Sequence, residues 1–75
     1  MSLRIDTVEI DDGNADHLIK HGVSLAEVED VFLSQPDIRR NKRSGRAHYY
    51  AIAKGIRVNF RYRPGVARPI SAWRP

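Results

Sequence analysis

The sequence contains no cysteine among its 75 residues, so neither a disulfide framework nor a thiolate metal site is available to it. It also lacks any long apolar run. The opening Met-Ser-Leu-Arg-Ile-Asp does not have the pattern of a signal peptide, and no segment is apolar over the length of a membrane span. We therefore expect a cytoplasmic protein with no membrane association. A chain of this length is enough for one small domain, expected over residues 1–75.

Acidic residues are missing from the second half of the chain. Nine acids and two bases precede Ile38, a net charge of −7, whereas eleven bases and no acid follow from Ile38 onward. Eleven like charges repel one another and lower the stability of the fold unless nearby anions neutralise them. Two explanations are open: the acidic half neutralises the basic half within the monomer, or a polyanionic partner does so. We favour the second, with nucleic acid as the partner.

In the acidic half, the spacing of the apolar residues predicts a short strand followed by two helices. The predicted elements are a strand within 3–10, a helix at 15–21 and a helix at 25–33. Gly13 or Asn14 is a candidate cap for the first helix, which Gly22 ends. Ser24 and Glu27 have the spacing of a capping box at the start of the second helix.

The basic half alternates with a period of two, which indicates strands. The predicted strands are 37–43, 48–53, 56–63 and 67–73, with turns at Ser44-Gly45, Lys54-Gly55 and Pro64-Gly65. Because the helices come together in sequence, the fold class is α+β. We expect two N-terminal helices packed on one face of a mostly antiparallel sheet, in the order β-α-α-β-β-β-β.

Alternation along the strands predicts which side chains face away from the helices. In the strand 56–63 the apolar residues Ile56, Val58, Phe60 and Tyr62 face the helices, which leaves Arg57, Asn59, Arg61 and Arg63 on the open face. In the last strand Ile70 and Ala72 suit the core, with Ser71 and Trp73 on the open face. The strand 48–53 is ambiguous. If Tyr50 and Ile52 are buried, then Tyr49, Ala51 and Ala53 line the open face.

Three segments carry a resemblance to a known family. They are Lys20-His21-Gly22-Val23-Ser24, the helical run Glu27-Val28-Glu29-Asp30-Val31-Phe32, and Arg68-Pro69-Ile70-Ser71-Ala72. Over about residues 10 to 74 the chain resembles the BrnT-type toxins (domain of unknown function 497), whose fold is similar to that of RelE-type ribonuclease toxins. The resemblance implies a RelE-like fold and a bacterial toxin of a type II toxin–antitoxin system that cleaves RNA. It also implies a cognate ribbon-helix-helix antitoxin as partner. The segment Lys20–Ser24 itself we interpret as a helix corner rather than a reactive site.

Cleavage of RNA by its own 2′-OH needs groups that stabilise charge on phosphorus and groups that transfer protons. Guanidinium groups suit the first task. The candidate catalytic residues are Arg57, Arg61 and Arg63, with Arg68 or Arg74 from the next strand, together with His48 and Lys54 for proton transfer and Tyr49 as a weaker candidate. For RNA binding we expect phosphate contacts from Arg39, Arg40, Lys42, Arg43 and Arg46, and base stacking by Trp73 or Tyr49. Each of these arginines can instead be a solvated strand residue, and Trp73 can be a core residue.

Neither a metal nor another cofactor is expected. His17 and His21 share one helix face near Asp16, but two imidazoles without a clear third ligand are a weak zinc signal. Two other functions remain open for the same basic face: a non-catalytic nucleic-acid-binding module, or a protein-interaction domain that docks an acidic partner. An antitoxin that masks this face is one instance of the latter.

Overall fold

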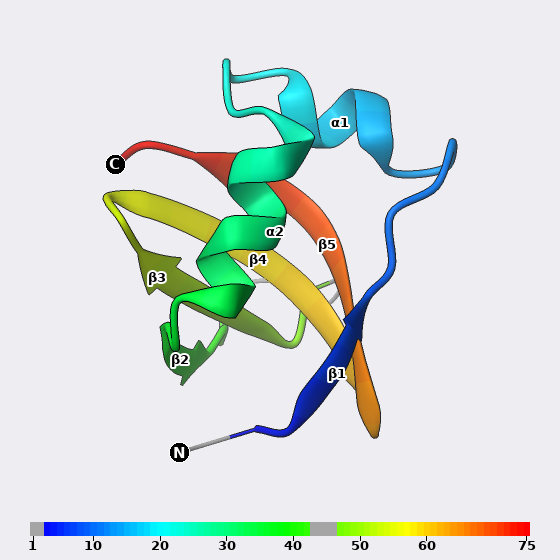
Figure 1. Ribbon diagram of the computed structural model, residues 1–75, viewed down its shortest axis with the longest axis vertical. Helices are drawn as coiled ribbons and strands as arrows, with labels where there is room; N and C mark the ends of the chain where they lie inside the picture. Colours follow the sequence, from blue (N-terminus) through cyan, green and yellow to red (C-terminus); the bar gives the residue numbers. More distant parts are fainter. Residues whose placement is uncertain (1–2, 43–46) are drawn as a thin grey trace.

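The computed structural model describes residues 3–42 and 47–75 (Figure 1). The elements along the chain are β1 (Ile5–Val8), α1 (Ala15–Ile19), α2 (Leu25–Leu33), β2 (Asp37–Arg40), β3 (Tyr49–Ala53), β4 (Ile56–Arg63) and β5 (Gly65–Trp73). This order confirms the predicted β-α-α-β-β-β-β arrangement. The predicted turn at Ser44-Gly45 lies outside the described residues.

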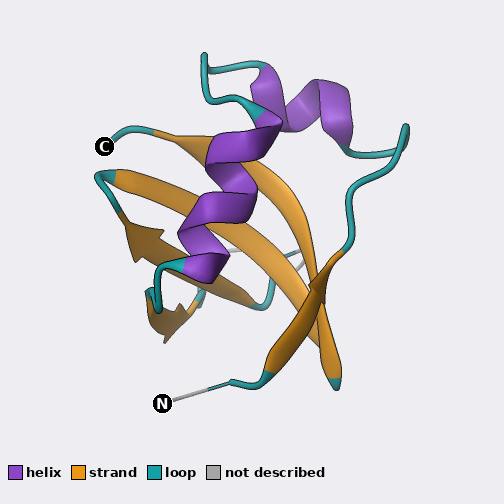
Figure 2. Cartoon of the chain, viewed as in Figure 1, coloured by secondary structure: helices purple, strands orange, loops and turns teal. Residues whose placement is uncertain are grey.

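The five strands form one sheet in the order β1-β5-β4-β3-β2. Strands β2 to β5 are antiparallel neighbours, whereas β1 pairs with β5 in parallel. Both helices lie on one side of the sheet, with α2 crossing in front of β4 and α1 beside the far end of β5 (Figure 2). The fold class is therefore α+β with a mostly antiparallel sheet, as predicted. We call the side of the sheet turned away from the helices the open face.

The corner between the helices follows from local sequence. Helix α1 ends at Ile19, two residues before the predicted end, and Gly22 then turns the chain at a φ of +83°, a conformation that glycine adopts without strain. The Ser24 hydroxyl accepts from the Glu27 N–H at 3.1 Å, and the Ser24 N–H donates to Glu27 Oε1 at 3.0 Å. The predicted capping box is thus present. Within residues 3–42 and 47–75, no helix has the length and apolar character that crossing a membrane requires.

The hydrophobic core fills the space between the helices and the sheet. Its buried members are Leu18, Val23, Val28, Val31, Ile38, Ala51, Ile56, Val58, Phe60, Ala67 and Ala72. Phe60 lies at its centre, with its ring centroid 5.1 Å from that of Phe32 and 5.9 Å from that of Tyr49. Aromatic pairs at such separations add to the free energy gained from area burial alone.

The structure resolves the ambiguity in β3, and Tyr49 on the open face is wrong. Ala51 is fully buried, and Tyr49 and Ala53 pack against the core. The reason is register: Tyr49 pairs with Phe60 and Ala51 with Val58, and directly paired residues share a sheet face. Tyr50 and Ile52 therefore project from the open face.

A second correction concerns Ile70 in β5. The pairing between β4 and β5 shifts beside Asn59 and Phe60, because Phe60 pairs with Pro69 whereas Asn59 pairs with Ser71. Ile70 is the extra residue of this β-bulge and is half-buried outside the core, whereas Pro69 takes a core position. The bulge changes the phase of the strand. Arg68 consequently lies on the open face together with Ser71 and Trp73.

Candidate functional site

A row of basic side chains crosses the open face. Arg61 of β4 pairs with Arg68 of β5, and His48 lies one residue beyond the Tyr49–Phe60 pair, next to Arg61. A hollow of about 280 Å³ is lined by His48, Arg61, Tyr62, Arg63 and Arg68. Four of the predicted catalytic residues are thus brought together: β4 contributes Arg61 and Arg63, β5 contributes Arg68, and His48 immediately precedes β3. The Tyr62 N–H donates to His48 Nδ1 at 3.5 Å, a long contact that orients the imidazole only weakly.

A second hollow adjoins the first because the two share Arg61 and Arg68. Its volume is about 270 Å³, and its lining is Gly13, Asn14, His17, Arg61, Arg68 and Ile70. His17 of α1 and His48 therefore line hollows that share Arg61, although the two histidines are 31 positions apart in the chain. The sequence alone indicates His17 only as a weak metal-ligand candidate. Nothing in its local spacing indicates that it shares a hollow with Arg61 of β4.

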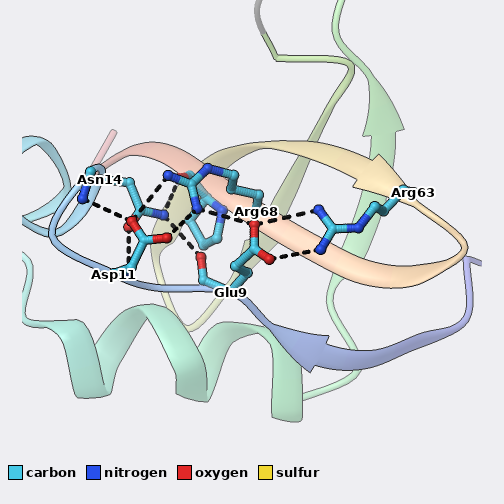
Figure 3. A network of polar contacts seen from close by, with 7 residues as sticks. Glu9, Asp11, Asn14, Arg63 and Arg68 are labelled. Atoms are coloured by element: carbon cyan, nitrogen blue, oxygen red, sulfur yellow. Dashed lines mark hydrogen bonds and ion pairs between the residues drawn. The ribbon is translucent and has the colours of Figure 1, made fainter.

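Carboxylates from the first half of the chain occupy two of these arginines (Figure 3). Arg68 donates to Asp11 Oδ2 at 2.8 Å, to Asp11 Oδ1 at 3.1 Å and to Glu9 Oε1 at 3.1 Å. Arg63 donates to Glu9 Oε2 at 2.7 Å. Figure 3 shows Arg68 between Asp11 and Glu9, with Arg63 on the far side of Glu9. We call these four residues the paired end of the open face.

The charges at the paired end change one another's pKa. Hydrogen bonds from Arg63 and then Arg68 lower the pKa of Glu9. The pKa of Asp11 is lowered by Arg68 and by the Gly13 N–H, which donates to Asp11 Oδ1 at 2.8 Å. In return Asp11 and Glu9 raise the pKa of Arg68, and Glu9 raises that of Arg63. All four groups are therefore held in their charged forms.

Asn14 fastens the acidic segment to β5. Its side chain is 4% exposed; the amide Nδ2 donates to the carbonyls of Glu9 and Pro69, each at 2.9 Å, and Oδ1 accepts from the Asp11 N–H at 2.8 Å. Asn14 is the N-cap residue of α1, but its side chain makes no capping hydrogen bond to that helix. The predicted helix cap is thus a clamp between two segments, which explains why Glu9 and Asp11 lie against β5.

Arg57 marks a different environment further along β4. Its guanidinium lies 3.9 Å from the centroid of the Tyr50 ring and 5.3 Å from that of the Trp73 ring, and its Nε donates to Asn59 Oδ1 at 3.2 Å. Arg57 pairs directly with Trp73 across the sheet. We call Tyr50, Arg57 and Trp73 the aromatic end of the open face. Trp73 was predicted there; Tyr50 was missed because the face of β3 was ambiguous.

Beside the aromatic end, a hollow of about 660 Å³ is lined by Arg39, Arg40, Asn41, Lys42, Tyr50 and Arg57. Arg39 forms an ion pair with Asp37 at 2.9 Å. No described residue forms an ion pair with Arg40 or Lys42, and both are exposed. The predicted phosphate-binding residues Arg43 and Arg46 lie outside the described residues.

Two predicted catalytic residues lie away from the open face. Lys54, in the β3–β4 turn, forms an ion pair with Asp30 of α2 at 2.6 Å. It lies six positions from His48 along an extended chain, roughly 20 Å at the usual rise. Arg74 forms an ion pair with Glu27 and donates to the Gly22 carbonyl at 3.3 Å, so it braces the helix corner. Neither side chain joins the hollows around Arg61.

Neutralisation within the monomer accounts for part of the positive charge of the basic half, and the remainder is left for a polyanionic partner. Of the nine bases in this half that the structure describes, five form ion pairs with acids of the first half: Arg39, Lys54, Arg63, Arg68 and Arg74. Arg40, Lys42, Arg57 and Arg61 form none with any described residue. The unmatched positive charge is therefore concentrated on β2, β4 and the residues that follow β2.

In the part of the chain that the structure describes, no three side chains of histidine, aspartate and glutamate are grouped so that they could hold a metal ion. Comparison with protein-family models, with curated proteins and with solved structures finds no match to this chain. The candidate site accordingly rests on the residues described above and on their geometry.

Proposed function

We propose that this protein is an endoribonuclease of the BrnT toxin type, with its reaction centre around Arg61. One observation carries the proposal: two imidazoles, His17 and His48, line adjoining hollows that share Arg61, whose guanidinium has no partner among the described residues. Imidazole titrates near neutral pH and suits proton transfer, whereas guanidinium stays charged and suits phosphate. The resemblance in the sequence supports the same class.

The reaction is an attack of the RNA on itself. The 2′-oxygen forms a bond to the adjacent phosphorus while the bond from phosphorus to the 5′-oxygen breaks. One of the two imidazoles accepts the proton of the 2′-OH, and the other, protonated, gives a proton to the departing 5′-oxygen. Arg61 stabilises the charge that gathers on the phosphoryl oxygens. The products are a 2′,3′-cyclic phosphate and a free 5′-hydroxyl, and the two imidazoles supply both proton transfers.

The carboxylates shape the site without taking part in bond breaking. Glu9 and Asp11 hold Arg63 and Arg68 at the rim of the hollows. A phosphate that approaches them must compete with these carboxylates, whereas Arg61 is open to it. We therefore assign Arg61 the direct contact with the reacting phosphate, and Arg63 and Arg68 a positioning role.

The experiment that tests this proposal follows the cleavage of a single-stranded RNA and identifies its ends. Cleavage should persist in EDTA, should give 2′,3′-cyclic phosphate ends, and should stop when the ribose at the cut site is 2′-deoxy. His48→Ala and His17→Ala should each lower the rate by about 100- to 10,000-fold with binding little changed. His21→Ala is the matched control, since His21 lies at the exposed helix corner. Loss of cleavage in EDTA, or cutting of the deoxy substrate, would falsify the mechanism.

The toxin class implies a ribbon-helix-helix antitoxin, and we propose that it covers the open face. Unmatched positive charge on Arg57 and Arg61 supports this placement, because an acidic partner surface would answer it. Arg61→Glu should weaken the complex by charge reversal, whereas Lys20→Glu, at the helix corner, should not. Equal affinity for both variants would place the antitoxin elsewhere, on the acidic helices.

A non-catalytic nucleic-acid-binding module is the second candidate. The observation that favours it is the pairing of Arg63 and Arg68 with carboxylates, which leaves fewer free cations for a transition state. RNA binding without any cleavage, in a preparation whose His48→Ala variant binds equally well, would establish this alternative.

A further inference from the structure

The aromatic end has a geometry that the fold itself does not require. Arg57 is half-buried on the open face, yet its charge faces two aromatic rings instead of a carboxylate. The Nε donates to Asn59 Oδ1, which fixes the plane of the guanidinium. A guanidinium held against aromatic rings gains cation–π attraction and presents a flat surface. Ile52, paired with Arg57 and 37% exposed, extends this surface on the β3 side.

Flat guanidinium and aromatic surfaces stack with unpaired nucleobases. Each base stacked in this way typically contributes about 1–3 kcal/mol to binding, and the contact is blind to sequence because every base has a π-face. A base within a duplex is already stacked and paired, so this surface selects a single strand.

The adjacent hollow supplies the partner for the backbone of such a strand. It contains Arg40 and Lys42, whose charges no described residue matches, and Arg39 at its edge. Arg57 is shared between the stack and the hollow. A surface for base stacking therefore lies next to a hollow that can bind phosphate. Proteins use this combination to bind single-stranded nucleic acids.

We propose that Tyr50, Arg57 and Trp73, with the hollow of Arg39, Arg40 and Lys42, form a subsite for single-stranded RNA separate from the centre at Arg61. An unpaired base stacks on the aromatic end, and the flanking phosphates lie in the hollow. Arg57 and Arg61 are four residues apart on one strand, roughly 13 Å. One strand of RNA can therefore occupy both places, and the inference rests on the proposed function for its choice of RNA.

Trp73 makes the subsite measurable, because it is the only tryptophan of the chain. The probe is a single-stranded RNA with 2′-O-methyl groups throughout, which binds but cannot be cleaved by 2′-OH attack. Its titration should quench the Trp73 fluorescence in a saturable manner and lose affinity as salt rises. An oligonucleotide of the same length with abasic sites keeps the phosphates, and it should bind about 5- to 100-fold more weakly.

Variants separate stacking from charge. Tyr50→Ala should weaken binding about 5- to 100-fold, and Tyr50→Phe should preserve it because the ring remains. Arg57→Lys should weaken binding despite the retained charge, because an ammonium offers no plane. Arg74→Ala is the matched control, since it removes one guanidinium from the helix corner. Thermal melting followed by circular dichroism shows that each variant is folded.

Three results would overturn the subsite: no quenching although a labelled strand binds, equal binding of the abasic strand, or equal binding of a duplex. Quenching by poly-glutamate with the same affinity would overturn it in favour of an acidic protein partner. The proposed function fails separately. Quenching without any cleavage leaves the subsite in place and removes the ribonuclease, whereas cleavage without quenching does the reverse.

Discussion

The two ends of the open face treat their arginines differently. At the paired end, Arg63 and Arg68 form ion pairs with the carboxylates of Glu9 and Asp11. At the aromatic end, the guanidinium of Arg57 makes cation–π contacts with the rings of Tyr50 and Trp73. A phosphate that approaches the first must displace a carboxylate, whereas the second keeps its full positive charge. The same residue type is therefore structural at one end and available to a ligand at the other.

Sheet order explains the difference. β1 pairs in parallel with β5 at residues 65–67, and the chain that follows β1 continues along β5, where Asn14 fastens it to Pro69. The acids of this segment therefore reach Arg68 and the adjacent end of β4. Within residues 3–42 and 47–75, no acid forms an ion pair with Arg57. Arg61 lies between the two ends, shares its hollows with Arg68, and has no ion pair with a described residue.

The largest effect should come from Arg61→Ala. Removing a group that stabilises transition-state charge typically costs about 100- to 1,000-fold in rate, and Arg61 contributes no ion pair to the fold. Single-turnover cleavage should fall by this factor while the Kd for a non-cleavable strand changes much less. Arg74→Ala should leave the rate intact. Equal losses of rate and of affinity in Arg61→Ala would mean that Arg61 only binds.

Asn14→Ala should remove the clamp of the paired end. Two carbonyls and one N–H lose their partner, and a polar group left unsatisfied in a buried place costs about 1–3 kcal/mol. We expect the free energy of unfolding to fall by about 2–3 kcal/mol in urea denaturation. Asn59→Ala is the matched control on the exposed side of β4, with a loss below about 1 kcal/mol. A larger loss in Asn59→Ala would contradict the role of Asn14.

Glu9→Gln should leave the paired end with an arginine that, like Arg57 at the aromatic end, has no carboxylate partner. It frees Arg63 completely and Arg68 in part, so one more cation is available to phosphate. Affinity for single-stranded RNA should rise several-fold at low salt, and the slope of log affinity against log salt should steepen by about 0.7. Asp30→Asn, which frees Lys54 at the β3–β4 turn away from the open face, should change neither quantity. An unchanged slope in Glu9→Gln would show that phosphate does not reach Arg63.

The smallest effect concerns pH. The pKa values of Glu9 and Asp11 are lowered in the folded protein by Arg63, Arg68 and the Gly13 N–H. Their contribution to stability is therefore complete above the ordinary carboxyl pKa of about 4 and is lost as the pH falls through the lowered values. The difference in Tm between the wild type and Glu9→Gln should be constant above about pH 5 and shrink below pH 4. A constant difference down to pH 2 would contradict this coupling.

The order of elements could be predicted almost completely from the sequence, since each element depends on neighbours in the chain. Gly22 and the Ser24–Glu27 box define the helix corner, and Lys54-Gly55 turns with both residues at positive φ, as a two-residue hairpin requires. The faces of β4 were also correct. The face of β3 was ambiguous from the sequence. In β5 the faces of Ser71, Ala72 and Trp73 were correct and that of Ile70 was wrong, because a bulge exchanges the faces and leaves little trace in the sequence.

The candidate site was predictable only in part. His48, Arg61, Arg63 and Arg68 were expected together and share a hollow. Arg74 follows Ala72 with the alternation of the strand, so it lies on the helix side, where Glu27 meets it. His17 and Tyr50 were missed. The sheet order alone brings His17 to a hollow shared with Arg61, and the register of β3 alone turns Tyr50 outward.

By itself, the sequence determined the local structure and the division of charge: two acidic helices, four strands without an acid after Asp37, and arginines on alternate positions of β4. Only the tertiary structure decided which of those charges meet. Glu9 and Arg63 are 54 positions apart, and Asp11 and Arg68 are 57 apart. Contacts at such separations depend on strand order, on the bulge beside Ile70 and on the clamp of Asn14, because these bring distant segments within the few ångströms over which an ion pair acts.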